Sequence, residues 1–287
     1  MSGRGGGRGG PRGGGGRGRG HSRGRGSRST PKATHRTPAA SAKQQQRQRR
    51  LEREAAAADA LAAEAQLGPV SFGFVRGTNP DRWNTKWQQR HPGRPLTFEA
   101  LGEDPLHSDP GQAVLDAGGV LLVRAPAVAA PRSDRSGKAL HAVKLYDEKI
   151  GLIVARDSDF VKLTELDDLG LLDLEMLLDH PGHLPGWPEP TPWADPSYAP
   201  RSVAEACELV ATGLGSALAA LPLAQHVTDR KLHRVIPLAE MLTRRDGSGD
   251  TALPKTAVFA VWHTAHDSNT VQELVGMLRG RTAHSSR

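Results

Sequence analysis

The feature that most constrains the fold is an abrupt change of composition along the chain. Residues 1–50 contain twelve Arg, two Lys and no acidic residue, a formal charge of +14, whereas the whole chain of 287 residues carries +7. The remainder therefore carries −7. All twelve aromatic residues lie between Phe72 and Trp262. A single globular unit over the whole chain is excluded, and, with Cys207 as the only cysteine, so is a disulfide framework.

Three segments follow from this change. Residues 1–43 are predicted to be a disordered Gly/Arg-rich basic tail, because they bury too little apolar surface to offset the entropy of ordering. Residues 44–67 contain strong helix formers and no Gly or Pro, which predicts an Ala-rich helix. Its alanine stripe favours a solvated spacer over a dimerising coil. Residues 69–287 are numerous enough to form a core of their own.

The sequence predicts a cytoplasmic protein with no membrane partner. No segment reaches the ~18 apolar residues of a membrane span. The N-terminus offers Gly and Arg where a secretory signal needs an apolar run, and its glycine content opposes the amphipathic helix of a mitochondrial transit peptide.

From Pro69 onward, strand-like and helix-like segments alternate. Apolar runs such as Val70–Val75 and Val120–Val123 predict strands, and the second has the continuous apolar character of a strand buried on both faces. Between such runs, capping residues open helices, as at Asn79-Pro80 and Asp109-Pro110. This alternation predicts an α/β fold with mostly parallel sheets.

Other segments predict the remaining elements. A capping box formed by Thr164 and Asp167 indicates a short helix, and Ser202 with Glu205 indicates another. Ala217–Leu221 is predicted to be a strand that Pro222 stops. Further strands and a last helix follow from the same patterns. They are Val235–Leu238, Ala257–Trp262 and a helix opened by Asn269 and Gln272.

The order of these segments resembles the substrate-binding (effector-binding) domain of LysR-type transcriptional regulators, in particular actinobacterial members without a DNA-binding head. The resemblance covers residues 69–287 and rests on loosely constrained motifs in the right order. The segments that carry it are FGFVRGTNPDRWNTKWQQRHPGRPL, DAGGVLLVRAP, LHAVKLYDEKIGLIVARDSD, ELVATGLGSALAALPLAQHV, LHRVIPL, AVFAVWHTAHDSNTVQELVGMLRG and RGRTAHSSR.

The resemblance implies a two-lobed domain of the periplasmic-binding-protein type II fold. Lobe I would contain residues 69–148 and 233–287, and lobe II residues 149–232. Crossover strands near Leu145–Leu152 and Leu232–Ile236 would join them. A small ligand would bind between the lobes, and the lobes of two copies would pair in a homodimer.

The chain departs from the family pattern in two places. Residues 1–68 contain no winged helix-turn-helix, which puts promoter recognition in doubt. The segment GGVLLVRAP around Val120 lacks the acidic residue that often precedes this strand in relatives, which leaves the ligand class open.

Four consecutive residues, Arg76, Gly77, Thr78 and Asn79, are the first ligand-binding candidates. They follow a strand and precede a helix, and ligands of open α/β sheets bind beyond the carboxyl ends of strands. The backbone N–H groups of a helix start favour an anion such as a carboxylate. The alternative is that Thr78 and Asn79 only cap the helix.

Two further residues complete the predicted ligand site. Arg124 follows the strand Val120–Val123 and is suited to clamp a ligand carboxylate, or else forms a surface salt bridge. Ser202 opens a lobe II helix and faces the cleft as a ligand residue, or else only caps that helix. The ligand is an unknown small molecule.

No catalytic centre, cofactor or metal site is predicted. Cys207 lies among apolar neighbours, which indicates a buried, inert thiol. The pairs His180/His183 and His263/His266 lack a third ligand for a metal. No nucleotide-binding or hydrolase glycine motif has the right context. We therefore predict a protein that is not an enzyme.

The basic tail supports an alternative function. Its positive charges would bind phosphate backbones by counterion release, without base selectivity because no aromatic residue is present for stacking. The simplest alternative is a solubilising tail without a partner. The arginines proposed to contact nucleic acid are Arg4, Arg8, Arg12, Arg17, Arg19, Arg23, Arg25 and Arg28.

Overall fold

The computed structural model describes residues 38–168, 175–178, 192–243, 250–252 and 255–280. By its internal contacts the chain divides into two units, Met1–Arg53 and Glu54–Arg287. The boundary falls inside the first helix, α1 (Pro38–Gln66), which begins earlier than the predicted residue 44. Residues 1–37 of the tail predicted to be disordered, with all eight candidate arginines, lie outside the described residues, whereas residues 38–43 are helical and belong to α1.

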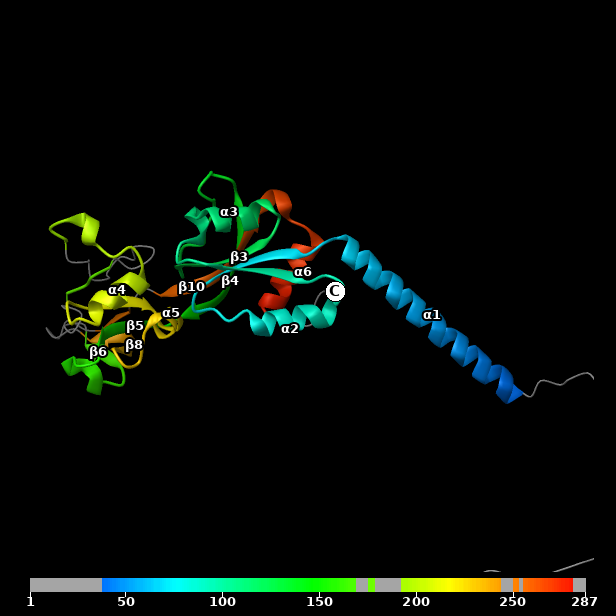
Figure 1. Cartoon of the computed structure of the whole chain (residues 1–287), viewed down its shortest axis with the longest axis horizontal. Helices are drawn as coiled ribbons and strands as arrows, with labels where there is room; N and C mark the ends of the chain where they lie inside the picture. Colours follow the sequence, from blue (N-terminus) through cyan, green and yellow to red (C-terminus); the bar gives the residue numbers. More distant parts are fainter. Residues whose placement is uncertain (1–37, 169–174, 179–191, 244–249, 253–254, 281–287) are drawn as a thin grey trace, which may run out of the picture. The chain divides into compact units, whose positions relative to one another are not determined.

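The second unit contains two mixed α/β sheets, which we call lobe I and lobe II together with their helices (Figure 1). Lobe I has the strand order β2-β1-β3-β10-β4. The bounds of its strands are β1 Val70–Val75, β2 Leu96–Leu101, β3 Val120–Pro126, β4 Leu140–Glu148 and β10 Thr256–His263.

Helices cover both faces of the lobe I sheet (Figure 1). Trp87 of α2 and Leu274 of α6 pack on one face with Phe72 and Trp262, and Leu115 of α3 packs on the other. Trp87 is 1% exposed, as expected for a core residue. The bounds of these helices are α2 Asp81–Arg90, α3 Asp109–Asp116 and α6 Asn269–Leu278.

Lobe II has the strand order β6-β8-β5-β7, with β9 paired to β8. Helices α4 and α5 cover one of its faces through Val203 and Leu223, which pack against Ile153 of β5. The bounds are β5 Ile150–Ala155, β6 Leu166–Asp168, α4 Val203–Val210, β7 Ala217–Ala220, α5 Leu221–Val227, β8 His233–Thr243 and β9 Asp250–Ala252.

Short 3-10 turns lie between these elements. Their bounds are η1 Pro105–His107, η2 Asp159–Lys162, η4 Pro196–Tyr198 and η5 Thr264–His266. No helix of the described residues is both long and apolar enough to cross a membrane.

The α/β class and the two-lobed arrangement are confirmed, but the sheets are mixed instead of mostly parallel. β1 pairs with β2 and β3, and β6 with β8, in parallel, whereas β10 runs antiparallel to β3 and β4. β5 likewise runs antiparallel to β7 and β8. The reason is the connectivity of the chain. It leaves the lobe I sheet through Lys149 after β4 and returns to that sheet as β10, which therefore runs in the opposite direction to β3 and β4.

Two local predictions were wrong, and a third was incomplete. The segment at Thr164 and Asp167 forms strand β6 instead of a helix, because Leu166 is fully buried in the lobe II core and pairs with β8. Pro222 stops a strand as predicted but also starts helix α5, where its missing N–H costs nothing. The second crossing comes after β8, later than Leu232–Ile236, because that whole strand pairs within the second sheet.

Candidate functional site

The loop after β1 brings the two lobes into close contact. Gly77 has a φ of 82°, in the left-handed region that glycine tolerates. A Cβ at this position would lie 2.7 Å from the backbone nitrogen of Leu223, at the start of α5 in lobe II. Only glycine therefore fits here, and the candidate ligand loop already contacts the opposite lobe.

The side chains of Thr78 and Asn79 make local hydrogen bonds. Thr78 Oγ1 donates to the carbonyl oxygen of Val75 at 2.7 Å, and Asn79 Oδ1 accepts from the backbone N–H of Asp81 at 3.0 Å. α2 starts at Asp81, two residues after Asn79. In this structure both side chains shape the turn that leads into the helix.

Arg124 forms a buried ion pair instead of the surface salt bridge considered as its alternative role, and the clamp on a ligand carboxylate stays a prediction. Its Nε donates to Glu148 Oε2 at 2.5 Å and its Nη2 to Glu148 Oε1 at 3.0 Å; the two side chains are 2% and 1% exposed. Nη2 also donates to the carbonyl oxygen of Arg76 at 3.2 Å. Nη1 is buried without a hydrogen-bond partner, so one donor of the guanidinium remains available.

Ser202 caps α4 as predicted. The return bond to the Glu205 carboxylate comes from the residue before Ser202 instead of from Ser202 itself. Ser202 Oγ accepts from the N–H of Glu205 at 3.2 Å, while the Glu205 carboxylate accepts from the N–H of Arg201. The backbone N–H of Val203, the first residue of α4, donates to Oε1 of Glu103 in lobe I at 2.9 Å. The N-terminus of α4 therefore already holds a carboxylate of the protein itself.

Glu103 is the main residue of this seam that the sequence analysis missed. Burial raises the pKa of its carboxyl, and the Val203 N–H and the charges of Arg124 and Arg76 oppose that rise. Glu103 lies just beyond β2. The rule that ligands bind beyond the carboxyl ends of strands indicated the residues after β1 and β3. Applied to β2 as well, it would have indicated Glu103.

A cavity of about 260 Å³ lies where the chain crosses between the lobes. Glu148 and Ile150 line it from the first crossing and Leu238 from β8. The charged lining is mixed: Lys149 and Lys255 are positive, and Asp147, Glu148 and Glu240 are negative. Lys255 pairs with Glu240 at 3.2 Å and Asp147 with Lys144 at 2.5 Å, whereas Lys149 forms no ion pair with a described carboxylate. None of the six predicted ligand residues lines this cavity, but Glu148 links it to Arg124.

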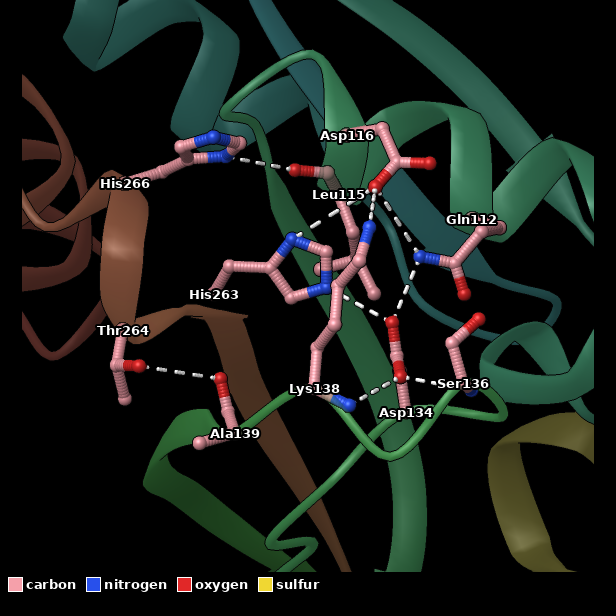
Figure 2. Close-up of polar contacts among 10 residues, drawn as sticks. All are labelled: Gln112, Leu115, Asp116, Asp134, Ser136, Lys138, Ala139, His263, Thr264 and His266. Carbon is pink, nitrogen blue, oxygen red and sulfur yellow. Dashed lines mark hydrogen bonds and ion pairs between the residues drawn. The ribbon is translucent and has the colours of Figure 1, made fainter.

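A second polar cluster lies in lobe I, around His263 at the end of β10 (Figure 2). His263 Nε2 lies 2.9 Å from Asp134 Oδ2, and Gln112 Nε2 donates to the same oxygen at 2.8 Å. Asp134 Oδ1 accepts from the backbone N–H groups of Ser136 and Lys138. Burial opposes the charged form, but these hydrogen bonds outweigh it and lower the pKa of Asp134 to about 2.

The polar groups of this cluster bond mainly to one another and to the backbone. The Asp134 carboxylate is fully occupied by four donors, and Asp116 Oδ1, on the other side of the ring, is 3.9 Å from His263 Nδ1 and is paired with Lys138. No group of three metal-ligand side chains occurs within the described parts of the chain. The pair His180/His183 lies outside them.

Cys207 is buried, 3% exposed, as the sequence predicted. Burial, and secondarily the charge of Glu103, raise the pKa of its thiol to about 12. Such a thiol is a poor nucleophile at neutral pH.

Comparison with known proteins supports the fold. No family model and no curated protein matches the chain. A Corynebacterium glutamicum OxyR C206 mutant matches at 18% identity, with 85% of this chain and 74% of that chain covered and a TM-score of 0.50. The reduced OxyR regulatory domain of Pseudomonas aeruginosa matches at 16% identity, with 74% and 95% covered and a TM-score of 0.47. The BenM effector-binding domain with benzoate matches at 16%, with 74% and 91% covered and a TM-score of 0.46.

The match with a TM-score of 0.50 supports the fold of the folded part. This part resembles the regulatory, effector-binding domains of LysR-type regulators, which have the periplasmic-binding-protein type II fold, and the predicted resemblance is confirmed at the level of the fold. The Corynebacterium glutamicum match covers more of the chain than residues 69–287 alone contain, so it extends into α1.

Proposed function

We propose that this protein is a non-enzymatic small-ligand-binding domain linked to transcriptional regulation, in which an effector alters the relative orientation of two lobes. The observation that carries the proposal is the cavity at the crossing, lined from both lobes. A molecule held by residues of both lobes stabilises one orientation over others, which is how binding shifts a conformational equilibrium.

The proposed ligand is a small carboxylate, whose charge Lys149 and Lys255 would meet while Ile150 and Leu238 cover its apolar part. Through Glu148, a ligand in the cavity would act on Arg124, because the two form one ion pair. A ligand that displaced Glu148 from Arg124 would break a buried ion pair, at a cost of roughly 3–5 kcal/mol. Arg124 itself does not line the cavity, so its unpartnered Nη1 would bind a ligand oxygen only if the lobes move, as proposed below for the other seam residues.

The other seam residues remain part of this proposal. Arg76, Gly77, Thr78, Asn79 and Ser202 would reach a ligand only if the lobes separate, because at present Gly77 touches α5 and the Ser202 helix binds Glu103. Ligand binding at the seam and lobe movement are therefore proposed to be coupled. A homodimer, implied by the resemblance, stays a prediction.

A thermal-unfolding screen of small carboxylates tests the proposal. We expect at least one compound to raise the Tm of the wild type. Ala239→Leu, which narrows the cavity that Ala239 lines, should reduce that shift, whereas Ala100→Leu on the exposed edge of lobe I should not. If no compound shifts the Tm of a well-folded protein, the effector-binding proposal is wrong.

The basic tail supports a second candidate function, association with nucleic acid through phosphate backbones. The supporting observation is the charge of +14 over residues 1–50 without a single acidic residue. If about six phosphates are neutralised, log K should fall with log salt at a slope near −5 on duplex DNA. Filter binding with and without residues 1–43 tests this, and unchanged affinity after deletion would eliminate it.

A further inference from the structure

A cavity of about 450 Å³ in lobe II is lined mainly by positively charged and polar side chains. It lies at the end of the sheet where β5 stops and β8 starts, away from the seam residues considered above. We call it the arginine pocket, and the side chains used below are Arg156, Gln225, Thr228, Arg230, His233 and Arg234.

Backbone pairing brings the three arginines together. Arg156 follows the last residue of β5, and its N–H donates to the carbonyl oxygen of Leu232 at 2.8 Å. Arg234 lies near the start of β8, opposite Val154 of β5. Arg230 lies in the tight turn before β8. In that turn Asp229 Oδ1 accepts from the N–H of Lys231 at 2.8 Å.

The floor of the arginine pocket is rigidly held. His233 is 6% exposed, and its ring nitrogens lie 3.1 Å from the carbonyl oxygen of Asp229 and 2.7 Å from that of Cys207. The Thr228 hydroxyl donates to the carbonyl oxygen of Ala224 at 2.8 Å. His233 and Thr228 are thus held by bonds within the protein, and the remaining polar lining of the pocket is Gln225 and the three arginines.

None of the three arginines forms an ion pair with a carboxylate in the described part of the chain. Arg234 Nε is buried and has no hydrogen-bond partner. This contrasts with Arg124, whose charge is balanced by Glu148. Arg156 and Arg230 are exposed and Arg234 is partly buried, and all three line one cavity, so an external anion would meet several positive charges together with the unsatisfied donor of Arg234.

The chemistry of the donors indicates the kind of anion. Guanidinium groups bind phosphate oxygens through paired N–H donors, and several together suit a group with many acceptor oxygens. The cavity also has room for more than a single inorganic ion. We propose that the arginine pocket binds a small molecule carrying a phosphate or diphosphate group, at a second site separate from the lobe crossing.

Thermal unfolding of the full chain isolates this site from the basic tail. Residues 1–43 are predicted to be equally available in folded and unfolded chains, so anion binding to them does not change the Tm. Only binding to the folded form does so. Inorganic pyrophosphate, compared with chloride at matched ionic strength, is therefore the probe.

We expect pyrophosphate to raise the Tm of the wild type, and its Kd to increase about tenfold or more for each arginine removed, as is typical of charge-assisted bonds. Arg156→Ala, Arg230→Ala and the double variant provide the test. Arg201→Ala removes an exposed lobe II arginine that does not line the pocket and should behave as the wild type. Arg230→Lys, which keeps the charge and is safe for folding, should lose part of the affinity.

A Tm shift that survives in the double variant, or no shift in the wild type, would overturn the proposal. A short DNA duplex in place of pyrophosphate distinguishes the sources of phosphate. If the duplex raises the Tm through the same arginines while pyrophosphate does not, the small-molecule proposal is wrong. These outcomes are independent of the carboxylate screen, because Ala239→Leu alters the crossing cavity and leaves the arginine pocket intact.

Discussion

The Asp134 cluster of lobe I and the arginine pocket of lobe II are both groups of charged side chains at strand ends, but their hydrogen bonding differs. The Asp134 carboxylate accepts from His263, Gln112 and two backbone N–H groups. In the arginine pocket, Arg234 Nε has no acceptor. Balanced groups of this kind stabilise the fold, whereas unbalanced donors are left for an external partner.

This contrast requires the floor of the arginine pocket to be as tightly packed as the Asp134 cluster. The reactivity of the buried Cys207 thiol tests that packing. With a pKa of about 12, its thiol should contain about a thousandfold less thiolate at pH 8 than an ordinary thiol of pKa 9, so the native protein should react more slowly than the unfolded one. Reaction with a disulfide reagent, followed by absorbance in native buffer and in denaturant, measures the ratio. Rapid reaction of the native protein would show a loose floor.

Removing the Asp134 carboxylate should have the largest effect on stability. In Asp134→Ala, Gln112, His263 and two backbone N–H groups lose their acceptor, and each orphaned group costs ~1–3 kcal/mol. We expect the free energy of unfolding to fall by at least ~3 kcal/mol. Urea unfolding measures this, with the exposed Glu99→Ala as the matched control. A loss below ~1 kcal/mol would mean that the cluster is not structural.

The same carboxylate predicts a dependence on acid. Because the pKa of Asp134 is lowered to about 2 from its ordinary 3.8, its stabilising effect is full above pH 4 and is lost as the pH falls toward 2. In Asp134→Asn this contribution is absent at every pH. The stability difference between the two proteins should shrink across that window, and a constant difference would contradict the assignment.

Sequence patterns predicted the elements that local chemistry determines. The apolar runs became β1, β3 and β10, and the serine at position 202 caps α4, because periodicity and capping depend on neighbours in the chain. Leu166 shows the limit. Its capping-box context suggested a helix, but burial in the lobe II core and pairing with β8 determined a strand.

The contacts of the site depend on long-range register, which composition does not reveal. Arg124 was predicted, but its partner Glu148 follows from the alignment of β3, β10 and β4. Glu103 reaches Val203 across a separation of 100 residues, and His263 reaches Asp134 across 129. Each pair joins two segments that lie far apart in the chain, and no local sequence pattern connects them.

The smallest effect, and the sharpest contrast with Asp134, is expected for Arg230→Ala. Because Arg230 has no carboxylate partner among the described residues, its removal should change the free energy of unfolding by no more than ~0.5 kcal/mol. Any change should be stabilising, since a like charge is removed beside Arg156 and Arg234.

Arg94→Ala is the matched control for that variant. Arg94 donates from Nε to the carbonyl oxygen of Gly68 at 3.1 Å and from Nη1 to Thr270 Oγ1 at 2.6 Å, so its loss should cost ~1–3 kcal/mol. Added salt should stabilise the wild type relative to Arg230→Ala, because screening weakens the repulsion that the variant lacks. Equal losses in the two variants would show that Arg230 already has a stabilising partner within the protein, and the distinction between the balanced and unbalanced clusters would then fail.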